Sequence, residues 1–555
     1  MRPFDSSGTF HPIAEGRGLR RAAVRGAGVT VFASAVSFVV QMAATVILAR
    51  LLTPTDFGIV TMVTTFSLFF SSFGLNGFTE AILQREEITH FLVSNLFWIN
   101  IAAAAFLTVV FALLGPLIAL FYHDPLVVRV VEGMSLTIIA ASLSVIHLAL
   151  LKRALRFTAV AVNTIVARIV SVLVSIALAL VGWGYWSLVA GYIAQQLSIS
   201  VGAWIMCRWT PGLPRRVPGT AAVVKFALNV YSHFGFYYAS GNTDNLLVGW
   251  RYKAAALGLY KKAFDLFYLP ANQLTSPISS VVIATLSRFN RDRAQYCRYF
   301  LAGFSFLAFV GMGIGADLSL IGRDMIRVVL GPAWDESARI FVFFGPGIGI
   351  MMLYGTQSWI HLSIGRPDRW FRWGVFEFLC TVSLFLIALP WGPRAVALAW
   401  TTSYFVLMAP AFWYAGKPID FGITAVLPVV WKFFVAALAA ACASLALIHF
   451  WPPFGNAPGG LGAFARCVSV SALFFALYLA AVVVLHRGIE PLRQAGRILG
   501  EMLPQRRAAQ SISADSTATP GDAAEPAPAA SVQESTTSSR VSLPAGKRVP
   551  LPEGN

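Results

Sequence analysis

The chain has 555 residues, of which 57% are hydrophobic and 12% are charged. A soluble globular protein carries about 25% charged residues, so this composition has too little polar surface for one and indicates an integral membrane protein. The formal net charge of +17 would suit nucleic-acid binding if the basic residues formed one stripe. They stand instead in short clusters between apolar runs, which argues against nucleic acid as a partner and fits the positive-inside rule of membrane insertion.

The N-terminal segment is basic, with Arg17, Arg20, Arg21 and Arg25 before the first apolar run. Such a start resembles the basic region of a signal peptide, but the run is too long and lacks a small-residue cleavage site. We therefore expect residues 1–28 to be cytoplasmic and to lead into an uncleaved first helix.

Apolar runs separated by polar breaks follow along most of the chain. Runs of about 18 or more apolar residues can cross roughly 30 Å of hydrocarbon as helices. Because Lys and Arg gather in every second connection, we expect both termini to be cytoplasmic. The fold class is an all-α polytopic membrane protein with about 14 transmembrane helices, near residues 29–48, 57–80, 92–116, 126–148, 158–181, 185–206, 226–248, 256–284, 299–321, 338–361, 372–390, 394–414, 427–449 and 465–485.

An internal repeat relates the two halves of the chain. The segment Ala49–Val60 aligns without gaps on Gly249–Tyr260, and in both a span ends, a short loop follows and an apolar-Gly-apolar step opens the next span. The first and second spans thus correspond to the seventh and eighth, as in transporters built from parallel repeats. We expect two six-helix lobes around a central cavity, at 29–206 and 226–414, joined by a cytoplasmic linker at 207–225.

The C-terminal part falls outside this six-plus-six pattern. The last two spans, in residues 427–485, form an appended transmembrane pair in this interpretation. Residues 486–555 form a cytoplasmic tail that becomes rich in Ala, Ser, Thr, Pro and Glu. Such a composition buries too little apolar surface to offset the entropy of ordering, so we expect the tail to be largely disordered.

Three motifs near the N-terminus carry a family resemblance. They are ILARLLTPTDFGIV at 47–60, FGLNGFTEAILQREEIT at 73–89 and NLFWIN at 95–100. In this order and spacing the chain resembles the polysaccharide transporter (Wzx/WzxC-like) family of the multidrug/oligosaccharidyl-lipid/polysaccharide exporter superfamily. The resemblance implies a transporter rather than an enzyme, working by alternating access without ATP hydrolysis. It fades in the last third of the chain.

Ionisable residues inside apolar spans are the candidate site residues, because each costs a few kcal/mol at the bilayer centre unless it faces a cavity or a partner. Arg168 lies about 15 Å from the cytoplasmic end of the fifth span, counting about 1.5 Å per residue. It is a candidate for binding an anionic group, and the alternative is a buried ion pair or a carbonyl cap. Lys261 and Lys262 begin the eighth span, where they either join this cationic site or extend to the membrane surface. Asp265 is one turn beyond Lys261 and can pair with it.

Acidic residues are candidates for binding a coupling ion. Asp244, Asp265 and Glu80 are the candidate coupling acids, with Glu377 as a further acid in a span. Glu80 and Glu377 could instead pair with Arg85 and Arg372. The five cysteines show no CxxC or Cys/His spacing, which predicts neither a metal site nor a disulfide framework, and no cofactor is expected.

The leading hypothesis is a flippase that moves a lipid-diphosphate-linked oligosaccharide, of the undecaprenyl-diphosphate type, across the bacterial inner membrane. The resemblance implies export for O-antigen, capsule or exopolysaccharide, with membrane lipid and other polysaccharide assembly proteins as further partners. One alternative is a cation-coupled multidrug exporter of the same superfamily, which would need an acid-lined cavity. A second is a polytopic glycosyltransferase or polymerase, which would need a longer loop or soluble domain than the connections here provide.

Overall fold

The computed structural model describes residues 3–5, 8–10, 17–85, 87–215, 218–289, 292–450 and 459–502. Within these ranges the chain is helical, apart from two isolated β-bridges near the N-terminus. The helices are α1 (Arg17–Leu51), α2 (Pro54–Gln84), α3 (His90–Leu113), α4 (Gly115–Tyr122), α5 (Leu126–Arg153), α6 (Phe157–Leu180), α7 (Tyr185–Cys207), α8 (Thr220–Ser240), α9 (Thr243–Arg288), α10 (Arg293–Val329), η1 (Pro332–Trp334), α11 (Asp335–Tyr354), α12 (Gln357–Ser363), α13 (Pro367–Ala388), η2 (Leu389–Trp391), α14 (Pro393–Gly416), η3 (Lys417–Ile419), α15 (Ile423–Phe450), α16 (Gly459–His486) and α17 (Glu490–Met502).

Twelve helical stretches of the described chain are long and apolar enough to cross a membrane. They confirm the all-α polytopic fold. The two remaining predicted spans, 226–248 and 256–284, fall on α8 and α9, which do not meet that criterion. The reason is polarity, because α9 carries six charged residues in its first half, namely Asp244, Arg251, Lys253, Lys261, Lys262 and Asp265.

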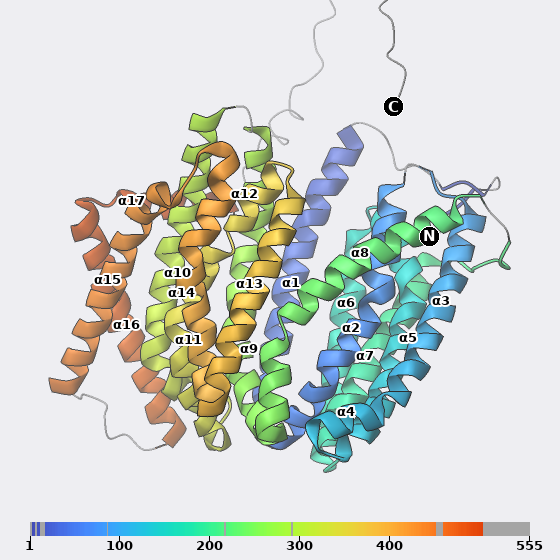
Figure 1. The fold of residues 1–555 in the computed structure, drawn as a ribbon, viewed down its shortest axis with the longest axis horizontal. Coiled ribbons are helices and arrows are strands. Elements are labelled where there is room, and N and C mark those ends of the chain that lie inside the picture. The colour runs from blue at the N-terminus through green and yellow to red at the C-terminus, as the bar shows by residue number, and fades with distance from the viewer. Residues whose placement is uncertain are drawn as a thin grey trace, which may run out of the picture. The chain divides into compact units, whose positions relative to one another are not determined.

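The predicted span 226–248 is not one continuous helix. The structure ends α8 at Ser240 and starts α9 at Thr243. Gly241 and Asn242 stand between them, and both residue types favour turns over helix interiors. In Figure 1, α8 runs obliquely across α2 before the chain enters α9, and α8 packs against α2.

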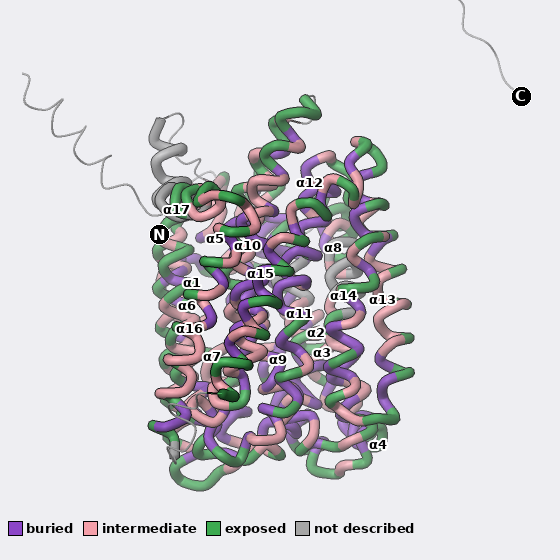
Figure 2. The backbone as a smooth tube through the Cα atoms, turned by 90° about the vertical axis from the view of Figure 1, so that its left-hand side faces the viewer, coloured by how far each residue is buried: buried purple, intermediate pink, exposed green. Residues whose placement is uncertain are grey.

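Helices α1–α7, here called the N-terminal lobe, and α9–α14, here called the C-terminal lobe, form two neighbouring groups (Figure 1). The most apolar stretch of α5 is 78% buried and that of α16 is 17% buried. Buried residues gather on the inner faces of the helices in Figure 2. Large apolar side chains such as Phe32, Phe106 and Leu173 are exposed on the outside, as expected for helices whose outer face meets lipid. The last two apolar helices, α15 and α16, pack against α10.

The starts of α2 and of the second part of α9 are equivalent positions. Helix α2 begins at Pro54, after a capping box in which Thr53 accepts from the backbone N–H of Asp56 and the Asp56 side chain accepts in return. Inside α9 the helix is interrupted at Lys253, whose φ of 68° and ψ of −178° are not helical. A new helical segment therefore begins at Ala254, which the repeat aligns with Pro54.

The two aligned glycines of the repeat lie at one helix crossing between the lobes. A Cβ atom on Gly58 would overlap the backbone carbonyl of Ala254, and a Cβ atom on Gly258 would overlap the backbone carbonyl of Pro54. The repeat exchanges these two contacts, as a two-fold symmetric interface does. Glycine is required at both positions because any side chain would prevent the backbones from approaching this closely.

A second exchanged pair of contacts lies at the same end of the lobes. The indole N–H of Trp334, in the turn between α10 and α11, donates to the carbonyl oxygen of Ala49 at 2.8 Å. In the other half, the Lys253 ammonium donates at 3.3 Å to the carbonyl oxygen of Tyr122, which ends α4. The turn after α10 thus holds the end of α1, and the end of α4 holds the interruption in α9.

The linker that follows α7 is fixed to α3. The backbone N–H of Arg215 donates to Asn95 Oδ1 at 2.9 Å, and the Asn95 amide donates back to the Arg215 carbonyl. The Trp98 indole donates to the carbonyl of Gly212 at 2.9 Å, and the Gly212 N–H donates to Ser94 Oγ at 3.0 Å. The NLFWIN motif therefore serves the fold, because its first Asn and its Trp bind the linker backbone.

Candidate functional site

Arg168 lies near the middle of α6 and contacts neutral side chains from two other helices. Its Nη1 donates to Gln41 Oε1 of α1 at 2.6 Å, and Gln195 Oε1 of α7 lies 3.5 Å away. Within the described ranges Arg168 forms no ion pair, and its Nε is enclosed without a hydrogen-bond partner. The alternative of a buried ion pair is therefore wrong for the described residues, and the positive charge of Arg168 is not neutralised there.

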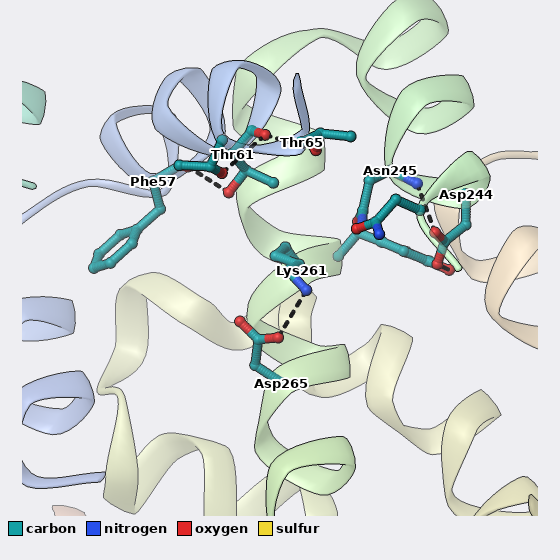
Figure 3. Close-up of polar contacts among 10 residues, drawn as sticks. Phe57, Thr61, Thr65, Asp244, Asn245, Lys261 and Asp265 are labelled. Carbon is teal, nitrogen blue, oxygen red and sulfur yellow. Dashed lines mark hydrogen bonds and ion pairs between the residues drawn. The ribbon is translucent and has the colours of Figure 1, made fainter. Parts of the chain in front are cut away.

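Lys261 and Asp265 form the expected pair one turn apart on α9. The Lys261 ammonium lies 2.9 Å from Asp265 Oδ1, and the two side chains are 27% and 26% exposed. Figure 3 shows them beside Thr61 and Thr65 of the neighbouring helix α2. Each side chain thus keeps about a quarter of its surface accessible.

Lys262 contacts the other lobe through an aromatic ring. Its ammonium lies 4.0 Å from the ring centroid of Phe57, the first residue of the second apolar run. A cation over a ring face gains about 0.5–2 kcal/mol, depending on its exposure. Lys261 thus contacts a side chain of its own helix, and Lys262 contacts a side chain of α2.

Tyr192 of α7 connects the two groups of cationic candidates. It lies within electrostatic range of Arg168 on its own lobe and of Lys261 and Asp265 on α9. Its side chain is 36% exposed. Arg168, Tyr192, Lys261 and Asp265, which come from both lobes, are here called the polar strip.

Asp244 is buried and bonded within the C-terminal lobe. It is 4% exposed, and its Oδ2 accepts from the Tyr260 hydroxyl at 2.9 Å while its Oδ1 accepts from the Asn245 N–H at 2.8 Å. Lys261 lies within electrostatic range of Asp244. Figure 3 shows Asp244 and Asn245 on a separate stretch of chain to one side of Lys261.

The remaining acids do not join this group. Glu80 is exposed on α2, and no ion pair with Arg85 occurs among the described side chains. Glu377 bonds to the Tyr354 hydroxyl, whereas Arg372 pairs with Asp368 at 3.4 Å. The suggestion that Glu377 pairs with Arg372 is therefore wrong. Arg372 pairs instead with Asp368, which lies one turn before it on α13.

Sequence reasoning missed the partners of the charged residues. Gln41, Gln195, Tyr192 and Tyr260 are uncharged residues in apolar runs, and nothing in their spacing distinguishes them. The one available signal was polarity, because Gln41 is the single amide side chain in a first span whose other polar residues are Ser and Thr.

A comparison with known proteins identifies the family of this chain. Residues 47–339, more than half of the chain, match a family model described as polysaccharide biosynthesis protein. The chain belongs to the polysaccharide biosynthesis protein family. The matched region includes both copies of the repeat and all of the polar strip between Arg168 and Asp265.

This family member has curated relatives in polysaccharide biosynthesis. It is 20% identical to the succinoglycan biosynthesis transport protein ExoT of Rhizobium meliloti, over 68% of this chain and 76% of ExoT. It is also 20% identical to the lipopolysaccharide biosynthesis protein WzxC of Escherichia coli, over 71% of this chain and 82% of WzxC. The teichuronic acid biosynthesis protein TuaB of Bacillus subtilis is 24% identical over 64% of this chain and 77% of its own length.

Solved transporters share the fold of this family member. The lipid II flippase MurJ in an inward closed conformation superposes with a TM-score of 0.67 at 14% identity, covering 84% of this chain and 99% of MurJ. An inward-facing multidrug resistance transporter of the MATE family gives a TM-score of 0.55 at 12% identity, covering 69% of this chain and 94% of that structure. The protein is thus a multi-pass membrane protein with a transporter fold.

Proposed function

We propose that the protein is a flippase that carries a lipid-diphosphate-linked oligosaccharide of the undecaprenyl type from the inner to the outer leaflet of a bacterial inner membrane. The observation that carries the proposal is the unneutralised Arg168 in the middle of α6, held by glutamine side chains. A buried cation is costly unless an anion or a polar cavity compensates it. A diphosphate supplies such an anion.

The wider polar strip fits the same cargo. Arg168 offers a planar fork for phosphate oxygens, and Tyr192, Lys261 and Asp265 add hydrogen-bonding groups that suit sugar hydroxyls. The lipid tail can remain in the bilayer while the polar head passes between the lobes. The family and the relatives in polysaccharide biosynthesis support a sugar-bearing cargo.

The transport cycle in this proposal is alternating access. In this proposal the exchanged glycine contacts between α2 and α9 hold the lobes together at the end where α1 turns into α2, and the cargo enters from the opposite end. With both termini in the cytoplasm, that opposite end is the cytoplasmic one. Asp244 and Asp265 are the acids proposed to bind a coupling ion, and the exposed Glu80 is the weaker candidate.

The multidrug exporter is the less suitable alternative. A cavity for cationic drugs needs a surplus of acidic over basic side chains. In this protein Asp265 is paired with Lys261, and Arg168 adds a positive charge without an acidic partner among the described residues.

A deletion strain of the source bacterium tests the proposal. Loss of the gene should stop export of the surface polysaccharide and cause its lipid-linked repeat unit to accumulate on the cytoplasmic side. Purified protein in liposomes should then move a fluorescent lipid-diphosphate oligosaccharide between leaflets, as measured by lectin access to the sugar. Normal export without accumulation in the deletion strain would contradict the proposal, and so would liposomes that move a cationic drug but not the lipid-linked sugar.

A further inference from the structure

The hydrogen bonds of Arg168 use one corner of its guanidinium group. Nη1 contacts Gln41 Oε1 at 2.6 Å and Gln195 Oε1 at 3.5 Å. The first distance is that of a strong charge-assisted hydrogen bond, and the second is at the limit of one. Gln41 is therefore the main partner, and it reaches Arg168 from a different helix, α1.

The opposite edge of the guanidinium group has no partner in the described chain. Nε is buried without a hydrogen bond, and Nη2 forms none with the described residues. The Nε and Nη2 donors form the planar fork that binds two oxygens of one phosphate at once. In this conformation Nε is enclosed by the protein, so Nη2 is the donor of this edge that a ligand can reach.

Gln41 fixes the guanidinium group of Arg168 without neutralising its charge. An amide oxygen accepts a hydrogen bond but carries no net charge, so the guanidinium keeps its full positive charge for a ligand. A carboxylate at the same place would form an ion pair with Arg168 and would compete with an anionic substrate. Glutamine at this position thus leaves the positive charge of Arg168 available to an anion.

We infer that Gln41 is a positioning residue that, by holding Nη1, orients Nη2 of Arg168 toward a phosphate group of the transported lipid. The inference rests on the proposed function. In this role Gln41 sets the orientation of the Arg168 guanidinium group and leaves its positive charge unpaired.

The test uses full-length protein in nanodiscs with undecaprenyl diphosphate as the probe. Gln41→Ala should weaken binding about tenfold, because the guanidinium loses the hydrogen bond that fixes its orientation. Gln41→Glu should weaken it about 100-fold or more, since the new ion pair occupies Arg168. Gln196→Glu is the matched control, because it adds the same carboxylate on α7 next to Gln195 without a hydrogen bond to Arg168, and it should change binding less than threefold.

Two further measurements separate positioning from a structural role. The Gln41→Glu protein should melt at or above the wild-type temperature, because it gains an ion pair, whereas loss of a purely structural contact would lower the melting temperature. In the liposome assay, Gln41→Ala should raise KM about tenfold and leave the maximal rate within twofold.

The outcomes distinguish the inference from the proposed function. If Gln41→Glu binds the probe as tightly as wild type while Arg168→Ala has lost binding, the role of Gln41 is refuted and the cationic site stands. If Arg168→Ala also binds normally, the cationic site itself is refuted. If Gln196→Glu is as damaging as Gln41→Glu, the effect comes from any added charge at this depth, which also overturns the assignment of Gln41.

Discussion

The crossing of α2 and α9 offers the most direct structural test. Gly58→Ala places a methyl group where the backbone carbonyl of Ala254 already lies. Because the obstacle is backbone, the two helices must move apart. Overpacking of this kind typically destabilises a protein by about 1–3 kcal/mol, so the melting temperature should fall by several degrees.

The internal repeat leads to a second prediction. Gly258→Ala meets the backbone carbonyl of Pro54 in the exchanged contact, so its effect should match that of Gly58→Ala. The double variant should be less destabilised than the sum of the two, since both substitutions separate the same pair of helices.

The control is Gly374→Ala in α13. A Cβ atom there has nothing within 4 Å, and replacing glycine inside a helix gains about 1 kcal/mol. Thermal unfolding of the three detergent-purified variants measures the difference. If Gly58→Ala and Gly258→Ala melt no lower than Gly374→Ala, the close crossing and the repeat-related contact are both refuted.

Three further outcomes are expected. Arg168→Ala should abolish polysaccharide export in a complemented deletion strain with the protein still inserted, and Arg168→Lys should restore part of it, because Lys lacks the planar fork; full export by the alanine variant would remove this residue from the mechanism. Asn95→Ala should lower the melting temperature by several degrees, since it removes both hydrogen bonds to the Arg215 backbone at about 0.5–1.5 kcal/mol each, and an unchanged melting temperature would show that the linker needs no anchor. Topology reporters at Gln505 and Gly455, which lie outside the described residues, should report opposite sides of the membrane, and a cytoplasmic Gly455 would contradict the appended pair of spans.

Local features could be read from the sequence because they depend on nearest neighbours along the chain. Long apolar runs were sufficient to predict a polytopic helical protein, since a lipid environment leaves helices as the way to satisfy the backbone. The Lys261 and Asp265 pair followed from helical spacing alone. The repeat alignment of Gly58 with Gly258 was also visible, although not that the two glycines would meet.

Contacts between helices were decided by tertiary packing. Gln41 and Arg168 are 127 residues apart, and no periodicity reveals that an amide on α1 will face a guanidinium on α6. The same holds for Lys262 against Phe57, for Tyr260 against Asp244, and for Glu377, whose partner is a tyrosine of α11. A helical pattern specifies which face of a helix is polar, but which side chain that face meets depends on how whole helices pack. The sequence by itself determined which charges enter the membrane region, and the tertiary structure decided which of them are neutralised and which remain available to a substrate.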